Sequence, residues 1–343
     1  MPLFIGINGF GRIGKTLFLQ LIDDPAIQVA AINAPGFNIQ NIATYLRYDS
    51  IHKYPNHFSI KIINETTFSV NDRMVSIFND RDASNLKWRD HGIKYVIDAT
   101  GSYLTTEKAG QHQVDYVMMT SPPKDNTPIF VYGVNQQFYN GQRVVSNASC
   151  TTNCIAPVLH FLETEYGIVS ANFTTIHATT ASQKTIDVLS SSSRTTRSIL
   201  NNIIPHSTGA SSSLAQLIPR VGGQIKGTSL RVPVSNVSIV DLNVRLNKDG
   251  TKLQGKTLLE DILEKCEDHW FIQLSKDGLV SSDFITSECP SIIDTKASMM
   301  LGEDEVKLMI WYDNEWSYSR QCINLLEIMA LSNGDIDEIE QDG

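Results

Sequence analysis

Residues 3–14 read LFIGINGFGRIG, and this stretch decides the fold of the first half of the chain. The apolar run at its start predicts a buried strand, and the spacing of Leu17, Leu21 and Ile22 predicts an amphipathic helix just after it. Between strand and helix, Gly9, Gly11 and Gly14 have the spacing G-x-G-x-x-G. A strand, a glycine turn and a helix in this order indicate a doubly wound α/β domain.

The glycine turn predicts a binding site for a dinucleotide. Its glycines allow a tight turn, close approach of a pyrophosphate and packing of the helix on the strand. The N-terminus of the helix then attracts the phosphate charge. The alternative interpretation is an ordinary glycine turn that binds no ligand.

The second strand, residues 29–32, ends without the acidic residue that holds the ribose hydroxyls in an NAD site. That position falls on Ala34, and no acid follows before Asp49. Since no carboxylate there repels the 2′-phosphate of NADP, we expect NAD as cofactor and leave NADP open. Two later strands end in small polar residues, which adds Thr100, Gly101 and Ser121 as cofactor candidates.

Residues 148–154 read ASCTTNC and stand just before an apolar run with helical spacing. Cys150 is therefore expected at a helix N-terminus, where backbone N–H groups and the helix dipole favour a thiolate. We interpret Cys150 as a nucleophile that is mostly ionised near neutral pH. The alternative is a small buried cysteine without a chemical role.

A partner for the thiol is expected at His177, which follows a segment with strand propensity. An imidazole within reach of Cys150 takes the thiol proton and then exchanges protons with the oxygen of a bound aldehyde. A structural or solvated histidine is the alternative. Further along, the hydroxyl of Thr208 and the guanidinium of Arg231 suit the oxygens of a phosphate.

Composition excludes several classes of protein. The chain has 343 residues, of which 41% are hydrophobic and 19% charged, as expected for a globular protein of two domains. A net charge of −9 argues against nucleic-acid binding, and no apolar stretch is long enough to span a membrane. The five cysteines have the spacing of neither a disulfide framework nor a metal site. The N-terminal residues lead directly into a strand, so we expect no signal peptide and a cytoplasmic protein.

Seven motifs follow one another along the chain: NGFGRIG (8–14), YDS (48–50), ASCTTNC (148–154), TTIHATTASQKT (174–185), STGA (207–210), RVPVSNVS (231–238) and WYDNEW (311–316). The series resembles the phosphorylating glyceraldehyde-3-phosphate dehydrogenase family over residues 3–332. The resemblance implies a Rossmann domain with a doubly wound parallel sheet, an α+β catalytic domain with a mixed or antiparallel sheet, and a homotetramer that works in glycolysis. We place the NAD(P)-binding domain at residues 1–149 with a C-terminal helix at 315–333, the catalytic domain at 150–314, and a solvated acidic tail at 334–343.

The resemblance also implies the chemistry. Cys150 attacks the aldehyde of D-glyceraldehyde 3-phosphate, His177 manages the protons as hydride passes to NAD(P), and inorganic phosphate releases the thioester as 1,3-bisphosphoglycerate. Substrate and phosphate oxygens are then held by Ser149, Thr151, Thr180, Arg194, Arg197, Thr208, Gly209 and Arg231. The expected cofactor contacts are, besides the residues above, Asn8, Arg12, Ile13, Arg81, Asn314 and Tyr318, with Asn314 orienting the nicotinamide carboxamide.

Departures from the family pattern leave the cofactor open. Ala34 replaces the usual acid, the segment at residues 187–190 is altered and one residue shorter, and Ser317 replaces a usual glycine. The first two fall where family members choose between NAD and NADP. Two rival functions remain: a relative that acts on erythrose 4-phosphate, with water releasing the acyl group, and a non-catalytic binding protein on the same fold.

Overall fold

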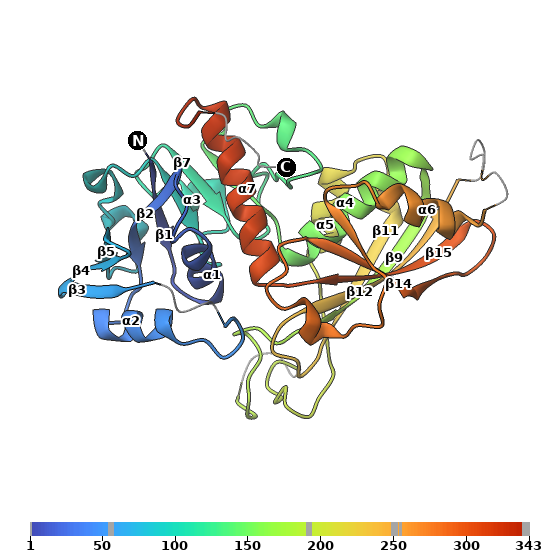
Figure 1. The fold of residues 1–343 in the computed structure, drawn as a ribbon, viewed down its shortest axis with the longest axis horizontal. Coiled ribbons are helices and arrows are strands. Elements are labelled where there is room, and N and C mark those ends of the chain that lie inside the picture. Colours follow the sequence, from blue (N-terminus) through green and yellow to red (C-terminus); the bar gives the residue numbers. More distant parts are fainter. Residues whose placement is uncertain (1, 54–57, 190–193, 248–252, 254–255, 338–343) are drawn as a thin grey trace. The chain divides into compact units, whose positions relative to one another are not determined.

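The computed structural model describes residues 2–53, 58–189, 194–247, 253 and 256–337 (Figure 1). Contacts divide the chain into two units, and unit 1 is built from residues 1–148 and 319–343. Unit 2 is the intervening segment, residues 149–318. The serine run at 190–193 and the last part of the acidic tail, 338–343, lie outside the described residues.

Within the described residues, unit 1 contains an eight-stranded sheet in the order β3-β4-β5-β2-β1-β6-β7-β8. The strands are β1 (Leu3–Asn8), β2 (Ile27–Asn33), β3 (Ile60–Asn64), β4 (Thr67–Val70), β5 (Arg73–Phe78), β6 (Tyr95–Asp98), β7 (Tyr116–Met119) and β8 (Val144–Ser146). The helices are α1 (Arg12–Gln20), α2 (Ile39–Arg47), α3 (Thr106–Ala109) and most of α7 (Trp316–Ser332), with the short 3₁₀ turns η1 (Ala83–Asn85), η2 (Trp88–His91) and η3 (Gln136–Phe138).

The parallel part of this sheet runs from β5 to β8 and has β1 at its centre (Figure 1). From β1 the chain moves outward to β2 and β5, then returns to β6 on the other side, so the strand order reverses beside β1. Ligands bind at such a reversal, outside the carboxyl ends of the strands. The predicted doubly wound sheet is confirmed. The antiparallel strands β3 and β4, which extend it beyond β5, were not expected from the sequence.

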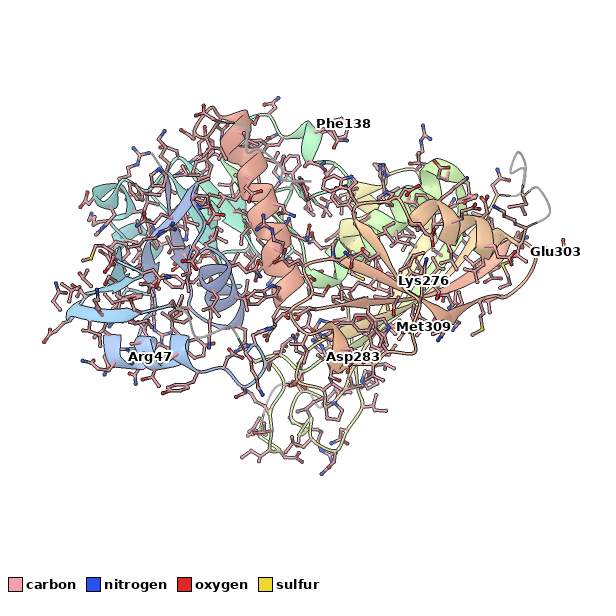
Figure 2. The ribbon with its side chains drawn as sticks, in the orientation of Figure 1. Arg47, Phe138, Lys276, Asp283, Glu303 and Met309 are labelled. Atoms are coloured by element: carbon pink, nitrogen blue, oxygen red, sulfur yellow. The ribbon has the colours of Figure 1, made fainter. Side chains whose placement is uncertain are left out.

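Helix α2 shows how local sequence sets the bounds of an element. It begins because Asn38 accepts a hydrogen bond from the backbone N–H of Asn41 at 2.9 Å and Asn41 reciprocates. Its apolar positions face inward, whereas its last residue, Arg47, is exposed (Figure 2) and donates to the carbonyl of Ile60 in β3 at 3.2 Å. The helix therefore packs beside β3.

Two segments far apart in sequence complete unit 1. The hydroxyl of Thr16 in α1 lies 2.6 Å from that of Ser319 in α7. Beyond α7, Asp335 accepts from the hydroxyl of Tyr95 at 2.7 Å and forms an ion pair with Lys94. The expectation of a solvated tail is therefore wrong for Asp335, because this carboxylate finds its partners on β6 and just before it.

Among the described residues, unit 2 contains a seven-stranded mixed sheet in the order β10-β11-β9-β12-β15-β14-β13. The strands are β9 (Ile168–His177), β10 (Ile204–His206), β11 (Ile225–Arg231), β12 (Ser238–Leu246), β13 (Ile272–Ser275), β14 (Ser291–Met300) and β15 (Glu305–Tyr312). The helices are α4 (Cys150–Glu165), α5 (Ala210–Leu217) and α6 (Leu258–Cys266), with 3₁₀ turns η4 (Gly222–Gln224) and η5 (Ser281–Phe284). Buried and partly exposed residues alternate along β12 and β15, and α4 packs on β14 and β15.

Candidate active site

The predicted helix N-terminus at the cysteine is confirmed, since Cys150 is the first residue of α4. The hydroxyl of Ser149 caps the helix by accepting from the backbone N–H of Thr152 at 3.2 Å. The carbonyl of Ser149 accepts from both the backbone N–H and the side-chain amide of Asn153, at 2.9 and 3.0 Å. These bonds fix where the helix starts, and with it the position of the thiol.

His177, the last residue of β9, lies next to this thiol. Its Nε2 atom is 3.5 Å from Cys150 Sγ, within hydrogen-bond distance for sulfur. The parallel pairing of β9 with β11 also places Arg231 opposite His177. The fold of unit 2 thus brings together three residues that the sequence analysis singled out separately.

Two groups compete for the other ring nitrogen of His177. Its Nδ1 lies 2.7 Å from the carbonyl oxygen of Ala178, which can only accept a hydrogen bond. The same Nδ1 lies 2.6 Å from Nη1 of Arg231, which can only donate one. Nδ1 cannot donate and accept at once. Whether Arg231 makes this hydrogen bond therefore decides which nitrogen of the His177 ring carries the proton.

The burial of Cys150 disfavours the thiolate expected from the sequence. Burial raises the pKa of the thiol, and the charge of Arg231 together with the backbone N–H of Thr151 offsets only part of this. Burial and then Arg231 lower the pKa of His177 to about 3. Desolvation therefore opposes the charged form of both groups, and at Cys150 it outweighs the helix N-terminus that the sequence predicts.

Tyr312 is a part of the site that sequence reasoning missed. Its buried hydroxyl lies 2.9 Å from the hydroxyl of Thr151 and 3.0 Å from that of Thr175, and its ring meets the His177 ring edge-on. Tyr312 thereby ties the first turn of α4 to β9. The motif WYDNEW contains this residue, but nothing in the motif indicates which of its side chains faces the thiol.

A strained residue links the histidine to Asn314. Val237 has a φ of 67°, a conformation that β-branched residues rarely adopt. Its neighbour Ser238 accepts from the backbone N–H of Ala178 at 3.0 Å and donates to Oδ1 of Asn314 at 2.8 Å. Asn236, on the other side, donates to Asp313 at 2.8 Å. The hydrogen bonds of Asn236 and Ser238 hold Val237 in its strained conformation, and the bond from Ser238 fixes the orientation of the Asn314 amide.

The predicted phosphate contacts divide into two groups. Thr180 lies two residues beyond Ala178 and donates to Gln183, and Gly209 stands at the N-terminus of α5. The two loop arginines lie at the surface: Arg194 is exposed, and Arg197 forms an ion pair of 3.0 Å with Asp187. Their proposed role near the thiol therefore has no geometric support from the described contacts.

The glycine turn of unit 1 has the form that a dinucleotide requires. A Cβ on Gly14 would lie 2.0 Å from the carbonyl oxygen of Gly9, so only glycine lets α1 approach β1 this closely. Gly9 itself has a φ of 89°. A Cβ on Gly11, by contrast, would meet no atom within 4 Å, and α1 starts there without a side-chain cap. The turn thus presents open backbone at a helix N-terminus, which fits a pyrophosphate.

An ion-pair cluster fixes the turn from the side. Arg12 makes two bonds to Asp49, of 2.6 and 3.1 Å, and the fully buried Nζ of Lys15 lies 2.8 Å from the same carboxylate. Burial alone would raise the pKa of Asp49, but the bonds from Arg12 and Lys15 outweigh it and hold the pKa well below its usual value. Asp49 is therefore committed to these two cations. Lys15 is a second residue that the sequence analysis did not single out.

A cavity of about 630 Å³ opens beside the turn at the end of β2. Its lining is Phe10, Gly11, Ala34, Pro35, Gly36, Phe37, Asn41, Ile42 and Tyr45, in which no side chain is charged. The volume and the aromatic lining suit an adenosine group. Ala34 lies at the predicted place, and the lining offers neither a carboxylate for a 2′-hydroxyl nor a cation for a 2′-phosphate.

The remaining cofactor candidates lie at the carboxyl ends of strands or in unit 2. Asn8 ends β1, Thr100 and Gly101 follow β6, and Ser121 follows β7. Arg81 is exposed in the loop after β5, and Ile13 lies in the first turn of α1. Asn314 and Tyr318 are buried residues of unit 2, so their cofactor contacts stay predictions.

Neither a metal site nor a membrane span is found in the described part of the chain. It contains no group of three or more His, Cys, Asp or Glu residues arranged to hold a metal ion. None of its helices has the length and hydropathy needed to cross a membrane.

A dinucleotide turn in one unit and a thiol–imidazole pair in the other are the two parts of a dehydrogenase that oxidises its substrate while bound to a cysteine. Comparison with known families supports this class. Residues 3–106 match the family described as "Glyceraldehyde 3-phosphate dehydrogenase, NAD binding domain", and residues 149–314 match its C-terminal domain. A nicotinamide dinucleotide is thus the cofactor.

Individual relatives agree along nearly the whole chain. Glyceraldehyde-3-phosphate dehydrogenase of Podospora anserina is 39% identical over 335 residues, which cover 96% of this chain and 98% of the relative. Glyceraldehyde-3-phosphate dehydrogenase A of Escherichia coli K12 is 41% identical over 331 residues, covering 95% and 98%. The chain therefore belongs to the glyceraldehyde-3-phosphate dehydrogenase family, and the resemblance seen in its motifs is confirmed.

Proposed function

We propose that this protein oxidises D-glyceraldehyde 3-phosphate to 1,3-bisphosphoglycerate, with inorganic phosphate as second substrate and NAD(P) as hydride acceptor. The observation that carries the proposal is the 3.5 Å approach of Cys150 Sγ to His177 Nε2 at the start of α4. Family membership supports the substrate, because the relatives bear its name.

The reaction begins at the thiol. Cys150 Sγ forms a bond to the aldehyde carbon while His177 Nε2 takes the thiol proton and passes it to the aldehyde oxygen. A bound NAD(P) would supply the hydride acceptor for this carbon. His177 then takes the hydroxyl proton, which leaves a thioester on Cys150. An oxygen of inorganic phosphate attacks the thioester carbon, and Cys150 leaves as a thiolate, which regains its proton before the next turnover.

Substrate binding prepares His177 for this work. The general base needs its proton on Nδ1, so that Nε2 can accept from the thiol. Arg231 opposes this state through its 2.6 Å contact with Nδ1. With the substrate phosphate held by Arg231 and Thr180, the guanidinium turns to the phosphate, and Nδ1–H donates to the carbonyl of Ala178.

The attacking phosphate is held by Ser149, Thr151, Thr208 and Gly209, and the family resemblance adds Arg194 and Arg197 nearby. The N-terminus of α5 supports this assignment, since Gly209 provides no side-chain cap there and the N-terminus of a helix attracts anions. The hydroxyls of Ser149 and Thr151 have a structural duty as well, toward Thr152 and Tyr312.

NAD serves as cofactor, and the site also admits NADP. The uncharged lining of the cavity around Ala34 supports this, because it neither attracts nor repels a 2′-phosphate. Asn314, whose amide is held by Ser238, orients the nicotinamide carboxamide, and Tyr318 packs nearby.

The active form is a homotetramer in the cytoplasm, where it serves glycolysis. Exposed apolar side chains on the loop after His177 support association with further copies of the chain: Ile186, Leu189, Leu200 and Ile203. Light scattering of wild type and of the Leu189→Ser variant tests this, and a monomeric wild type contradicts it.

The experiment that tests the function is the initial rate of cofactor reduction with glyceraldehyde 3-phosphate, measured with and without inorganic phosphate and with NAD or NADP. We expect a phosphate-dependent rate and kcat/KM values within about tenfold for the two cofactors. A rate without phosphate that is higher with erythrose 4-phosphate favours the rival dehydrogenase. No reduction with either aldehyde favours the binding protein.

A further inference from the structure

A row of buried polar side chains lies beneath the dinucleotide turn of unit 1. Its members are at most 3% exposed and come from η2, the loop before β7, and the ends of β6, β1 and β2: Trp88, His112, Asp98, Asn8 and Asn33. Apolar side chains such as Val96 and Val117 surround Trp88. Burying a polar group costs free energy unless it is hydrogen-bonded. Five such groups in one buried row therefore indicate a role beyond packing.

The first link fixes the tautomer of the histidine. The indole Nε1–H of Trp88 donates to Nδ1 of His112 at 3.2 Å. An indole nitrogen can only donate, so Nδ1 must accept and the proton of the ring must be on Nε2. Nε2–H then donates to Oδ2 of Asp98, also at 3.2 Å. The ring of His112 thus has one orientation, in which Nδ1 accepts and Nε2 donates.

Asp98, oriented by His112, makes hydrogen bonds to residues on both sides of the turn. Its Oδ2 also accepts from the side-chain amide of Asn8 at 2.6 Å. Its Oδ1 accepts from the backbone N–H and the hydroxyl of Thr100, at 3.2 and 2.7 Å. The carboxylate therefore has four donors on two oxygens, which uses its full capacity. The side-chain oxygen of Asn8 in turn accepts from Asn33 at 2.7 Å.

Thr100 and Asn33, which this hydrogen-bonded row fixes, lie on either side of Gly9. A Cβ on Gly9 would lie 2.7 Å from Cγ2 of Thr100, which places Thr100 directly against the turn. On the other side, the backbone N–H of Gly9 donates to the carbonyl of Asn33 at 3.0 Å. Any change at Asp98 is transmitted to the groups on both sides of this glycine.

We propose that His112 is a positioning residue for the dinucleotide: fixed by Trp88, it orients Asp98, which sets Asn8 and Thr100 around the turn that receives the pyrophosphate. This inference rests on the proposed function, since it concerns the same cofactor. The row acts on binding of the dinucleotide and not on the thiol chemistry, which belongs to unit 2.

The test compares His112→Leu with His112→Gln. Leucine removes both hydrogen bonds, whereas glutamine supplies a side-chain N–H for Asp98 and an oxygen for Trp88. Calorimetric titration of the cofactor-free protein with NAD should give a Kd raised about tenfold in the leucine variant and within about threefold of wild type in the glutamine variant. The alkylation rate of Cys150 should stay unchanged in both, and kinetics should show a raised KM for NAD at unchanged kcat.

A double-mutant cycle with Thr100→Val identifies the route. Thr100 is exposed, and valine removes its hydroxyl, which donates to Asp98 and accepts from the backbone N–H of Ser102. If Asp98 links the two residues, the combined effect on the Kd for NAD differs from the product of the single effects by about threefold or more. Independent effects overturn the route through Asp98.

The remaining outcomes are decisive as well. Equal NAD affinity in wild type and His112→Leu overturns the inference and leaves the proposed function intact, whereas a wild type that binds neither NAD nor NADP overturns the proposed function. Equal weakening by leucine and glutamine assigns His112 to packing and also overturns the inference. If His112→Leu does not fold, Trp88→Phe, which removes the indole N–H, replaces it; an unchanged Kd for NAD in that variant overturns the inference.

Discussion

The dinucleotide turn of unit 1 and the thiol centre of unit 2 solve their tasks in opposite ways. Around the turn, side chains are committed to one another, as Arg12 and Lys15 are to Asp49, and backbone is left for the ligand. Around the thiol, the interactions conflict: two groups compete for Nδ1 of His177, and Val237 is strained. A binding site can have all its side-chain interactions satisfied before its ligand binds. A reactive site instead retains strain and competing hydrogen bonds, which substrate binding relieves.

The largest effect should follow from removing the nucleophile. Cys150→Ser should lower the rate of cofactor reduction by at least about 10⁴-fold, because a serine hydroxyl at this site is a far weaker nucleophile. The Kd for NAD, measured by calorimetry, should stay within about threefold of wild type, since the turn lies in unit 1. Unchanged activity would show that the reaction does not take place at the Cys150 site of unit 2.

Two glycines of one turn should separate fold from binding. Gly14→Ala forces a Cβ to 2.0 Å from a backbone oxygen and should destabilise unit 1 by about 2–3 kcal/mol, seen as a lower Tm. Gly11→Ala meets no atom within 4 Å and should keep the wild-type Tm, yet weaken NAD binding by about tenfold or more, because the methyl group occupies the approach of the pyrophosphate.

Thermal unfolding and NAD titration of both variants check this pair. Equal Tm losses would contradict the assignment of the two glycines. If Gly11→Ala binds NAD with wild-type affinity, the pyrophosphate does not bind at this turn.

The pH dependence of the thiol sharpens the other side of the comparison. Only the thiolate reacts with iodoacetamide, and burial raises the pKa of Cys150. Alkylation of the cofactor-free protein should therefore keep accelerating as the pH rises through the ordinary thiol range. Cys150 should still be labelled first, since the other four cysteines are buried. The rate is measured by mass spectrometry of the labelled peptides. A rate that levels off near pH 6 to 7 would show that Cys150 is a thiolate at neutral pH, as the sequence predicts.

The smallest effect concerns the ribose. Ala34→Asp places a carboxylate in the cavity beside the turn and should weaken use of NADP about tenfold more than use of NAD, measured as kcat/KM. Ala34→Asn, of similar size without charge, is the matched control and should affect both cofactors alike. An equal response of NAD and NADP to the aspartate variant would place Ala34 away from the ribose.

Motifs predicted the parts of this protein that depend on neighbouring residues. The glycine spacing fixed β1, the turn and α1, and ASCTTNC located the start of α4, because these features depend on backbone sterics and capping over a few residues. The pairing of Cys150 with His177 was expected from residue chemistry, and the fold supplies the geometry.

What the sequence did not reveal depends on burial and on distant contacts. The raised pKa of Cys150 arises from desolvation by the finished fold, which no local motif encodes. Tyr312 reaches Thr151 across 161 residues of sequence, and the Arg231 contact with His177 depends on the register of β11 with β9. The strands β3 and β4 were missed because alternation alone does not tell how an edge strand attaches to a parallel sheet.

The discontinuity of unit 1 bears on how the chain is made. A ribosome delivers Thr16 and Tyr95 long before Ser319 and Asp335, the partners that complete their hydrogen bonds. Unit 2 is one continuous segment and can condense as soon as it has emerged. All strands of the unit 1 sheet therefore precede unit 2 in the chain, but helix α7 joins them only after the whole length of unit 2 has been translated. Unit 1, whose strands are translated before unit 2, is thus completed after it.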